Sequence, residues 1–248
     1  MQTENDKPDT ELPQADTPPA DKPVSTPTPE AVGEALAPEE SATTEAVISQ
    51  PMTIVDLLRH GQVATPNLFC APVNEPLGIP GWKQLTVATQ NGQWDVIISS
   101  PTRRCHDFAR LLAQRMKCDF VVEPMFGEMN FGHWIGQTQT ALWEKYPELM
   151  QQLWSQPRRF NAPGGERMED FINRVTYAWK QTQLQYAGQR VLILTHAGVI
   201  RVILSTVLEI IYQKSLRFEV DYAQFSRIHI YPDGVPSLVG HGLPNVPN

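Results

Sequence analysis

Two short apolar runs dominate the pattern of hydrophobic and polar positions in this chain. Residues 52–58 and 191–195 consist mostly of β-branched residues and leucine. Runs of this length predict short strands that are buried within a sheet. A histidine follows each run, His60 after the first and His196 after the second, and a glycine comes within two residues of each histidine. If the two strands are neighbours, both imidazoles lie at the sheet edge where α/β proteins bind ligands.

The rest of the pattern alternates between strands and helices. Further strands are expected at residues 95–100, 118–123 and 221–231, and a long loop at 62–85. Helical spacing of apolar residues predicts helices at 82–89, at 103–116, at 138–154 with a break at Pro147, and over a long stretch from 168 to 182. The order of these elements predicts an α/β fold. The tryptophans at 82, 94, 143, 154 and 179 are interpreted as core residues.

Residues 1–50 differ in composition from the remainder. They contain eight prolines and eleven acidic residues against two lysines, and no Phe, Tyr or Trp. Such a segment has too little apolar surface to offset the entropy of ordering. It also lacks the basic start and apolar stretch of a signal peptide. We therefore predict a disordered, acidic, proline-rich tail at 1–50 and a folded domain at 51–248.

Charge and cysteine content narrow the classes of function. The formal net charge of −7 divides into −9 for residues 1–50 and therefore +2 for the folded part. A mildly basic domain suits a small anionic substrate better than a nucleic acid. The three cysteines are odd in number and lack metal-type spacing, which favours a reducing cytoplasm. No apolar run is long enough to cross a membrane, so we expect no membrane partner.

Several polar residues at predicted strand ends suit phosphate chemistry. Arg59 offers a planar fork of donors, His60 can be a nucleophile near neutral pH, and Gly61 lets the backbone turn sharply. Residues 99–101 are expected to cap the helix at 103–116, which places Arg103 and Arg104 in its first turn. A cation at that end opposes the helix dipole, so an anion-binding role is favoured.

Two further groups complete the candidate site. Glu128 lies in a loop with two aromatic residues, where a carboxyl group can act as a proton donor. The helix expected after His196 would direct its free N–H groups toward the same place.

The sequence resembles the histidine phosphatase superfamily, also called the phosphoglycerate mutase-like fold, over residues 53–231. Its motifs occur in the family's order as Leu58-Arg59-His60-Gly61, Ser99-Ser100-Pro101-Thr102-Arg103-Arg104, Glu128 ahead of Phe131-Gly132-His133-Trp134, Pro163-Gly164-Gly165-Glu166, and Thr195-His196-Ala197-Gly198. The resemblance implies a three-layer α/β/α sandwich with a mostly parallel central sheet, and it makes residues 51–248 a catalytic domain.

The resemblance also implies roles for individual residues. His60 is phosphorylated during turnover, Glu128 is the proton donor, and His196 is the second catalytic histidine. The substrate-binding residues it implies are Arg59, Arg104, Gly61, Asn67 and Ala197. No metal ion and no cofactor are expected. Spacing from the serine pair favours Arg104 over Arg103, which is interpreted as a surface residue. His133 lies close to Glu128 in the sequence but is interpreted as a residue without a functional role.

Three positions depart from the family pattern. Gln62-Val63 replaces the usual Glu-Thr pair, Pro66 stands where a phosphate-binding asparagine is common, with Asn67 one residue late, and Ile135 replaces an acidic residue. None of these changes removes a residue that does chemistry. The loop at 128–136, the His-Ala-Gly motif and residues 221–228 are most similar to the α-ribazole phosphatase and broad-specificity phosphatase branch.

We therefore expect a metal-independent phosphomonoesterase that acts through a phosphohistidine on a small phosphorylated metabolite, with α-ribazole 5′-phosphate as one candidate. Two alternatives stay open, a protein phosphohistidine phosphatase and a non-catalytic phosphate-binding regulatory module. Glu166 is kept as a second candidate for the acid. A homodimer is also left open.

Overall fold

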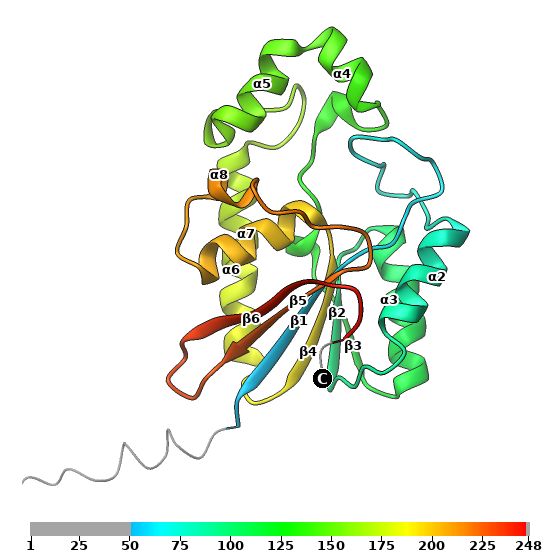
Figure 1. The fold of residues 1–248 in the computed structure, drawn as a ribbon, viewed down its shortest axis with the longest axis vertical. Helices are drawn as coiled ribbons and strands as arrows, with labels where there is room; N and C mark the ends of the chain where they lie inside the picture. Colours follow the sequence, from blue (N-terminus) through cyan, green and yellow to red (C-terminus); the bar gives the residue numbers. More distant parts are fainter. Residues whose placement is uncertain (1–50, 247–248) are drawn as a thin grey trace, which may run out of the picture. The chain divides into compact units, whose positions relative to one another are not determined.

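The computed structural model describes residues 51–246, and within them a six-stranded sheet forms the centre of the fold (Figure 1). The strand order is β3-β2-β4-β1-β5-β6. The strands are β1 Thr53–Arg59, β2 Val96–Ser99, β3 Asp119–Val122, β4 Arg190–Thr195, β5 Phe225–Ile230 and β6 Pro236–Leu243. The first four run parallel to one another, and β5 and β6 are antiparallel additions at one side. The predicted α/β fold with a mostly parallel sheet is confirmed.

Helices cover both faces of this sheet. Helices α2 (Ile79–Ala88) and α3 (Arg103–Met116) pack on one face, against Leu58, Ile97 and Leu192. On the other face, α6 Met168–Gln185 and α7 Ala197–Val207 pack against Val55, Leu57 and Ile193. The same core takes in residues of α4 Gln139–Lys145, α5 Pro147–Ser155 and α8 Tyr212–Ser215. Short 3₁₀ turns lie at η1 Pro124–Phe126, η2 Gly132–Trp134 and η3 Pro157–Arg159. The result is the expected α/β/α sandwich.

The register of β1 and β4 positions the candidate chemistry. These strands are parallel neighbours, and Arg59 lies opposite Thr195. His60 and His196 therefore leave the sheet side by side, at the carboxyl ends of the two central strands. The expectation that the two apolar runs bring both imidazoles together is confirmed.

Some element boundaries differ from the sequence-based expectation. Helix α2 begins at Ile79 rather than residue 82, because Pro80 is well placed in a first turn and Gly81 packs directly on Gly61. A Cβ on Gly61 would lie 2.4 Å from the Gly81 carbonyl oxygen. The expected strand at 221–231 is shorter, at 225–230, and β6 follows it unpredicted.

Two tryptophans also differ from expectation. Trp143 is 40% exposed and Trp154 is 43% exposed, whereas Trp94 and Trp179 are buried as predicted. Both exposed residues lie on the short helices α4 and α5 rather than on the sheet.

A buried polar cluster interrupts the apolar pattern of β1. Asp56 is 1% exposed and accepts hydrogen bonds from Arg227 Nε at 2.8 Å and from Trp94 Nε1 at 2.8 Å. A buried carboxylate is tolerated when it is paired and fully hydrogen-bonded. This pairing ties β1 to the antiparallel strand β5.

The predicted tail at 1–50 lies outside the residues that the structure describes. Within residues 51–246, every helix is too short or too polar to pass through a lipid bilayer. The cytoplasmic location and the homodimer stay predictions from the sequence.

Candidate active site

His60 is held in one orientation at the end of β1. Its side chain is buried, and its Nδ1 lies 2.8 Å from the backbone oxygen of Gly61. A carbonyl oxygen only accepts hydrogen bonds, so Nδ1 carries the proton and Nε2 keeps its lone pair. Burial, followed by the charges of Arg104 and Arg59, holds the pKa of His60 well below its ordinary value. The ring is therefore neutral, with Nε2 available as a nucleophile.

Two arginines line the space in front of this ring. Arg59 donates from Nη1 to the Val220 carbonyl oxygen at 2.6 Å, and its guanidinium lies 3.9 Å from the centroid of the Tyr222 ring. Arg104 is 3% exposed and donates from Nη1 to the Pro72 carbonyl oxygen at 2.7 Å. Both Nε atoms are buried and have no hydrogen-bond partner among the described residues. The two guanidiniums thus retain donors for an anion.

The structure distinguishes the two adjacent arginines at the start of α3. The side chain of Arg103 is 57% exposed and pairs with Asp107 at 3.3 Å on the helix surface. Arg104 turns inward to the cavity. This placement is the one that the sequence favoured.

His196 is fixed by a serine and faces Arg104. Its Nε2 lies 2.7 Å from Ser100 Oγ, and its Nδ1 lies 3.5 Å from Arg104 Nη2. A guanidinium only donates, so Nδ1 accepts and Nε2 carries the proton. Burial, followed by the charge of Arg104, lowers the pKa of His196 well below its ordinary value.

The serine pair therefore has a different use from the expected helix cap. The residue that caps α3 is Thr102, and its side chain makes no capping hydrogen bond. The Ser100 hydroxyl is instead turned toward His196, which fixes an imidazole. The sequence analysis thus placed Ser100 correctly at the start of α3, but its expected role as a helix cap was wrong.

Glu128 lies between η1 and η2, and main-chain N–H groups hold its carboxylate. Its Oε2 accepts from the Gly198 N–H at 3.2 Å, and its Oε1 accepts from the Met129 N–H at 3.0 Å. Gly198 belongs to the first turn of α7. One of the N–H groups expected to face an anion at this helix end is thus bound to the Glu128 carboxylate.

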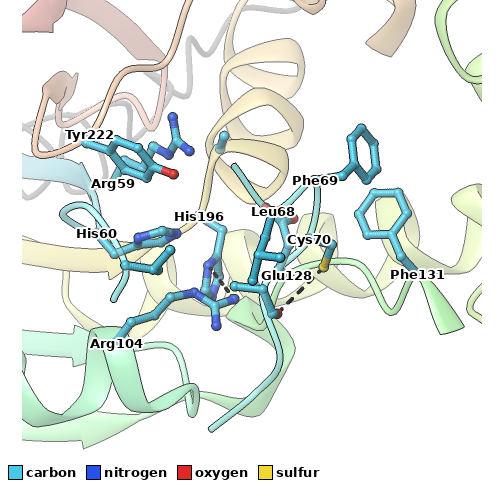
Figure 2. A pocket seen from close by; sticks show the side chains of 13 residues that line it. Arg59, His60, Leu68, Phe69, Cys70, Arg104, Glu128, Phe131, His196 and Tyr222 are labelled. Atoms are coloured by element: carbon cyan, nitrogen blue, oxygen red, sulfur yellow. Dashed lines mark hydrogen bonds between the residues drawn. The ribbon is translucent and has the colours of Figure 1, made fainter. Parts of the chain in front are cut away.

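A cavity of about 80 Å³ brings most of the predicted residues together (Figure 2). In this view Arg59 and Arg104 lie on opposite sides of His60, and His196 lies close to Arg104. The walls of this cavity include Arg59, His60, Arg104, Glu128, His196 and Ala197. Gly61 stands behind the nucleophile as the acceptor for its Nδ1–H.

The structure does not bring Asn67 to this cavity. Asn67 is exposed and has a φ of 63°, a conformation that asparagine adopts more readily than most residues. Its neighbours Leu68 and Phe69 line the cavity instead. His133 is also exposed and outside the cavity walls, as expected.

Tyr222, Phe69 and Cys70 also line the cavity, and the sequence analysis had assigned them no role. Tyr222 packs against Arg59, and its ring centroid lies 5.5 Å from that of His60. Its position follows from Ala223, whose N–H lies 3.2 Å from the Arg59 carbonyl oxygen. Phe69 and Cys70 come from the long loop after β1, and burial raises the pKa of the Cys70 thiol to about 12. A loop without periodicity offered no signal for either residue.

A second cavity, of about 240 Å³, adjoins the first. The two share Arg59, Phe69, Glu128, Phe131 and Ala197. Most of the other residues that line the second cavity are apolar, and Arg201 and Glu219 are its further charged residues. The apolar and aromatic residues include Met129, Leu153, Trp154, Met168, Phe171, Tyr212 and Leu216. Trp154, expected in the core, is thus part of a cavity wall.

The part of the chain from 51 to 246 contains no group of three His, Cys, Asp or Glu residues arranged to hold a metal ion. The positive charge in the first cavity comes from Arg59 and Arg104.

Comparison with proteins of known sequence identifies relatives. The bifunctional protein Rv2228c of Mycobacterium tuberculosis is 31% identical over 188 residues, which cover 73% of this chain and 51% of that protein. Phosphoserine phosphatase 1 of Hydrogenobacter thermophilus is 28% identical over 136 residues, covering 55% of this chain and 64% of that protein. The match thus spans about half to two thirds of the length of these relatives.

Comparison with solved structures supports the fold. A putative α-ribazole-5′-P phosphatase from Escherichia coli superimposes with a TM-score of 0.70 at 20% identity, over 79% of this chain and 98% of that chain. The native mycobacterial glucosyl-3-phosphoglycerate phosphatase Rv2419c gives a TM-score of 0.68 at 19% identity, over 77% of this chain and 99% of that chain.

A family model also matches most of the chain. Residues 55–242 match the model of the histidine phosphatase superfamily (branch 1). This range begins in β1, ends in β6 and includes every residue that lines the first cavity. The chain therefore belongs to branch 1 of the histidine phosphatase superfamily.

Proposed function

We propose that this chain hydrolyses small phosphomonoesters without a metal ion, through a phosphohistidine formed on His60. The observation that carries the proposal is the position of Glu128, which lies in the walls of both cavities. A carboxyl group at that junction can reach the oxygen that joins a phosphoryl group in the first cavity to an alcohol in the second.

The first cavity has the charge and size for a phosphoryl group. Arg59 and Arg104 supply fixed positive charge, and His196 adds a ring nitrogen near Arg104. Phosphoryl transfer depends mostly on positioning and on stabilising the charge of the equatorial oxygens. Two guanidiniums can supply that stabilisation in a water-poor site.

The first chemical step uses the lone pair on His60 Nε2. That nitrogen attacks phosphorus in line, the N–P bond forms and the ester P–O bond breaks. The departing alkoxide takes the proton of the Glu128 carboxyl group and leaves as the alcohol. The Gly61 carbonyl oxygen, bound to Nδ1–H, stabilises the positive charge that the ring acquires.

The second step returns the enzyme to its starting state. Glu128, now a carboxylate, takes a proton from water, whose oxygen attacks phosphorus as the N–P bond breaks. Inorganic phosphate leaves, and His60 is again neutral. A low pKa of His60 suits this cycle, because the ring must begin as a free base.

The second cavity supports a leaving group with an apolar ring. Its walls include Phe69, Phe131, Trp154 and Tyr212, and its volume of about 240 Å³ suits a ring system larger than a serine side chain. α-Ribazole 5′-phosphate, with an aromatic base on a sugar, is a candidate of this class. The likeness to the putative α-ribazole-5′-P phosphatase from Escherichia coli agrees with it at the level of the fold.

The alternatives have less support. A protein phosphohistidine phosphatase needs an open, shallow pocket, whereas His60 is only 7% exposed and His196 is fully buried. A non-catalytic phosphate-binding module needs neither a free-base histidine nor a carboxyl group at the cavity junction.

A screen of phosphomonoesters with the 248-residue chain tests the proposal. The set should contain α-ribazole 5′-phosphate, naphthyl phosphate, phosphoserine and a phosphohistidine peptide, with His60→Ala as the control. We expect hydrolysis of the ring-bearing esters at the highest kcat/KM and none by the control. Hydrolysis of the peptide alone, or equal rates with His60→Ala, would contradict it.

A further inference from the structure

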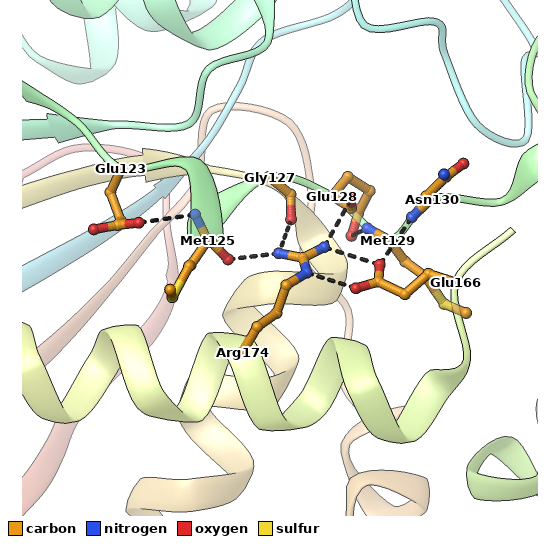
Figure 3. A network of polar contacts seen from close by, with 8 residues as sticks. All are labelled: Glu123, Met125, Gly127, Glu128, Met129, Asn130, Glu166 and Arg174. Atoms are coloured by element: carbon orange, nitrogen blue, oxygen red, sulfur yellow. Dashed lines mark hydrogen bonds and ion pairs between the residues drawn. The ribbon is translucent and has the colours of Figure 1, made fainter.

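Arg174 connects helix α6 to the loop that carries Glu128 (Figure 3). Its Nη1 donates to the carbonyl oxygens of Met125 at 2.5 Å and Gly127 at 2.9 Å. Its Nη2 donates to the carbonyl oxygen of Glu128 at 3.1 Å. One guanidinium therefore fixes the backbone leading into Glu128 and the peptide unit of Glu128 itself.

Glu166 holds the chain on the other side of Glu128. It accepts from Arg174 Nε at 2.6 Å and from Arg174 Nη2 at 3.0 Å, a bidentate ion pair. Its Oε2 also accepts from the Asn130 N–H at 3.1 Å, and its own N–H donates to the Asn130 carbonyl oxygen at 2.8 Å. Arg174 and Glu166 together thus bind the backbone before and after the acid.

Two glycines, Gly165 beside Glu166 and Gly132 in the loop that follows Glu128, allow the two loops to approach closely. A Cβ on Gly165 would lie 2.4 Å from the Asn130 carbonyl oxygen, and a Cβ on Gly132 would lie 2.4 Å from the Pro163 carbonyl oxygen. The loop at 163–166 and the loop at 128–134 therefore touch backbone to backbone. Two motifs far apart in the sequence form one rigid support.

Glu166 is engaged in this support rather than in the cavity. It lines neither of the two adjoining cavities, whereas Glu128 lines both. Its side chain is 16% exposed and that of Arg174 is 25% exposed, so the pair is partly shielded from water. Its bonds to Arg174 and Asn130 leave Glu128 as the carboxyl group at the reacting centre.

We propose that Arg174 and Glu166 are positioning residues that set the Glu128 carboxyl group at the leaving oxygen. The inference rests on the proposed function, in which Glu128 is the acid. None of the contacts of Arg174 touches the Glu128 carboxylate, so its influence passes through the backbone. Displacement of a catalytic group by about 1 Å can reduce a rate roughly 10²-fold.

The test compares Arg174→Gln with the wild type on two substrates. One is an alkyl phosphate, whose leaving group needs a proton, and the other is p-nitrophenyl phosphate, whose leaving group does not. We expect kcat for the alkyl ester to fall by roughly 10- to 100-fold and kcat for the aryl ester to change by less than about threefold. Lys180→Gln, the same loss of charge on an exposed position of α6, should change neither.

A second variant separates geometry from charge and from misfolding. Arg174→Lys keeps the positive charge that acts on His196 but cannot bridge several carbonyl groups and Glu166 at once. It should show the same selective loss on the alkyl ester. Thermal unfolding of both variants records whether the fold is intact.

A double-substitution cycle gives the decisive result. In a Glu128→Gln background the acid is already absent, so adding Arg174→Gln should cost little further activity on the alkyl ester. Equal losses on both substrates, or losses that multiply in that background, would overturn the inference. If Glu128→Gln is selective and Arg174→Gln and Arg174→Lys are not, only this inference fails. If Glu128→Gln itself lacks selectivity, the proposed function fails with it.

Discussion

The rings of His60 and His196 lie edge to face with their centroids 5.1 Å apart. In His60, Nδ1 is bound to the Gly61 carbonyl oxygen at 2.8 Å. In His196, Nε2 is bound to Ser100 Oγ at 2.7 Å, and Nδ1 lies 3.5 Å from Arg104 Nη2. His60 Nε2 is therefore the ring nitrogen that remains for phosphorus, and His196 contacts Arg104, which lines the same cavity.

The two histidines should make stability depend on pH. Burial lowers the pKa of both rings well below 6.5 in the folded state. Below pH 6.5 the unfolded chain binds protons at these positions and the folded chain does not, so the free energy of unfolding falls as the pH falls. Each histidine contributes at most about 1.4 kcal/mol per pH unit to this slope.

Denaturant unfolding between pH 7.5 and pH 5 measures this effect. We expect His60→Gln to reduce the slope of the free energy of unfolding against pH by up to about 1.4 kcal/mol per pH unit. The reason is that only one buried imidazole, His196, then remains. The same slope in both proteins would show that His60 is protonated as easily in the folded state as in the unfolded chain.

Ser100 should control the activity of His196. Ser100→Ala removes the nearest partner of a buried ring N–H and leaves Thr102 Oγ1 at 3.2 Å and Cys105 Sγ at 3.8 Å. Loss of one hydrogen bond costs about 0.5–1.5 kcal/mol, so kcat should fall by up to about tenfold. Ser100→Thr, which keeps the hydroxyl, is the matched comparison. Unchanged kcat in Ser100→Ala would show that the hydrogen bond does not orient His196 for catalysis.

Gly198 should be intolerant of a side chain because of Glu128. A Cβ on Gly198 would lie 2.3 Å from Glu128 Oε1 and 3.2 Å from Phe171 Cζ. Gly198→Ala should therefore displace the carboxylate and reduce turnover of an alkyl phosphate by roughly 10²-fold, with a smaller loss on an aryl phosphate. Glu128→Gln should show the same selectivity. A uniform loss on both substrates in Glu128→Gln would mean that Glu128 only shapes the cavity.

Positive charge from Arg59 and Arg104 should make added metal unnecessary. We expect phosphomonoesterase activity to survive EDTA and to be inhibited by vanadate, which adopts the geometry of pentacoordinate phosphorus. Steady-state rates with and without chelator measure this directly. Activity that is lost with EDTA and restored by a divalent ion would require a different mechanism.

Much of the site could be predicted because it depends on sheet topology. The apolar runs of β1 and β4 predict buried strands. Because these two strands are parallel neighbours, His60 and His196 follow them at the same edge of the sheet. The choice of Arg104 over Arg103 came instead from the spacing of the family motif that begins at Ser99, and the structure buries Arg104. Strand periodicity and motif spacing are both visible in the sequence.

The features that escaped prediction depend on contacts between distant segments. Strand β6 contains Pro236, Gly240 and Gly242, which weaken the strand pattern, and it is only half buried. Tyr222 reaches the cavity because its backbone turns at Ala223, which has a φ of 57°. Asn67 points elsewhere because the loop after β1 places Leu68 and Phe69 at the cavity. No local pattern encodes these placements.

The central claim is that His60 carries the phosphoryl group during turnover, and rapid quenching with a ³²P-labelled phosphomonoester tests it most directly. We expect up to one labelled phosphate per chain, stable to alkali and labile to acid, located on His60 and absent from His60→Ala. Turnover without any labelled protein, or label that persists in His60→Ala, would contradict the account.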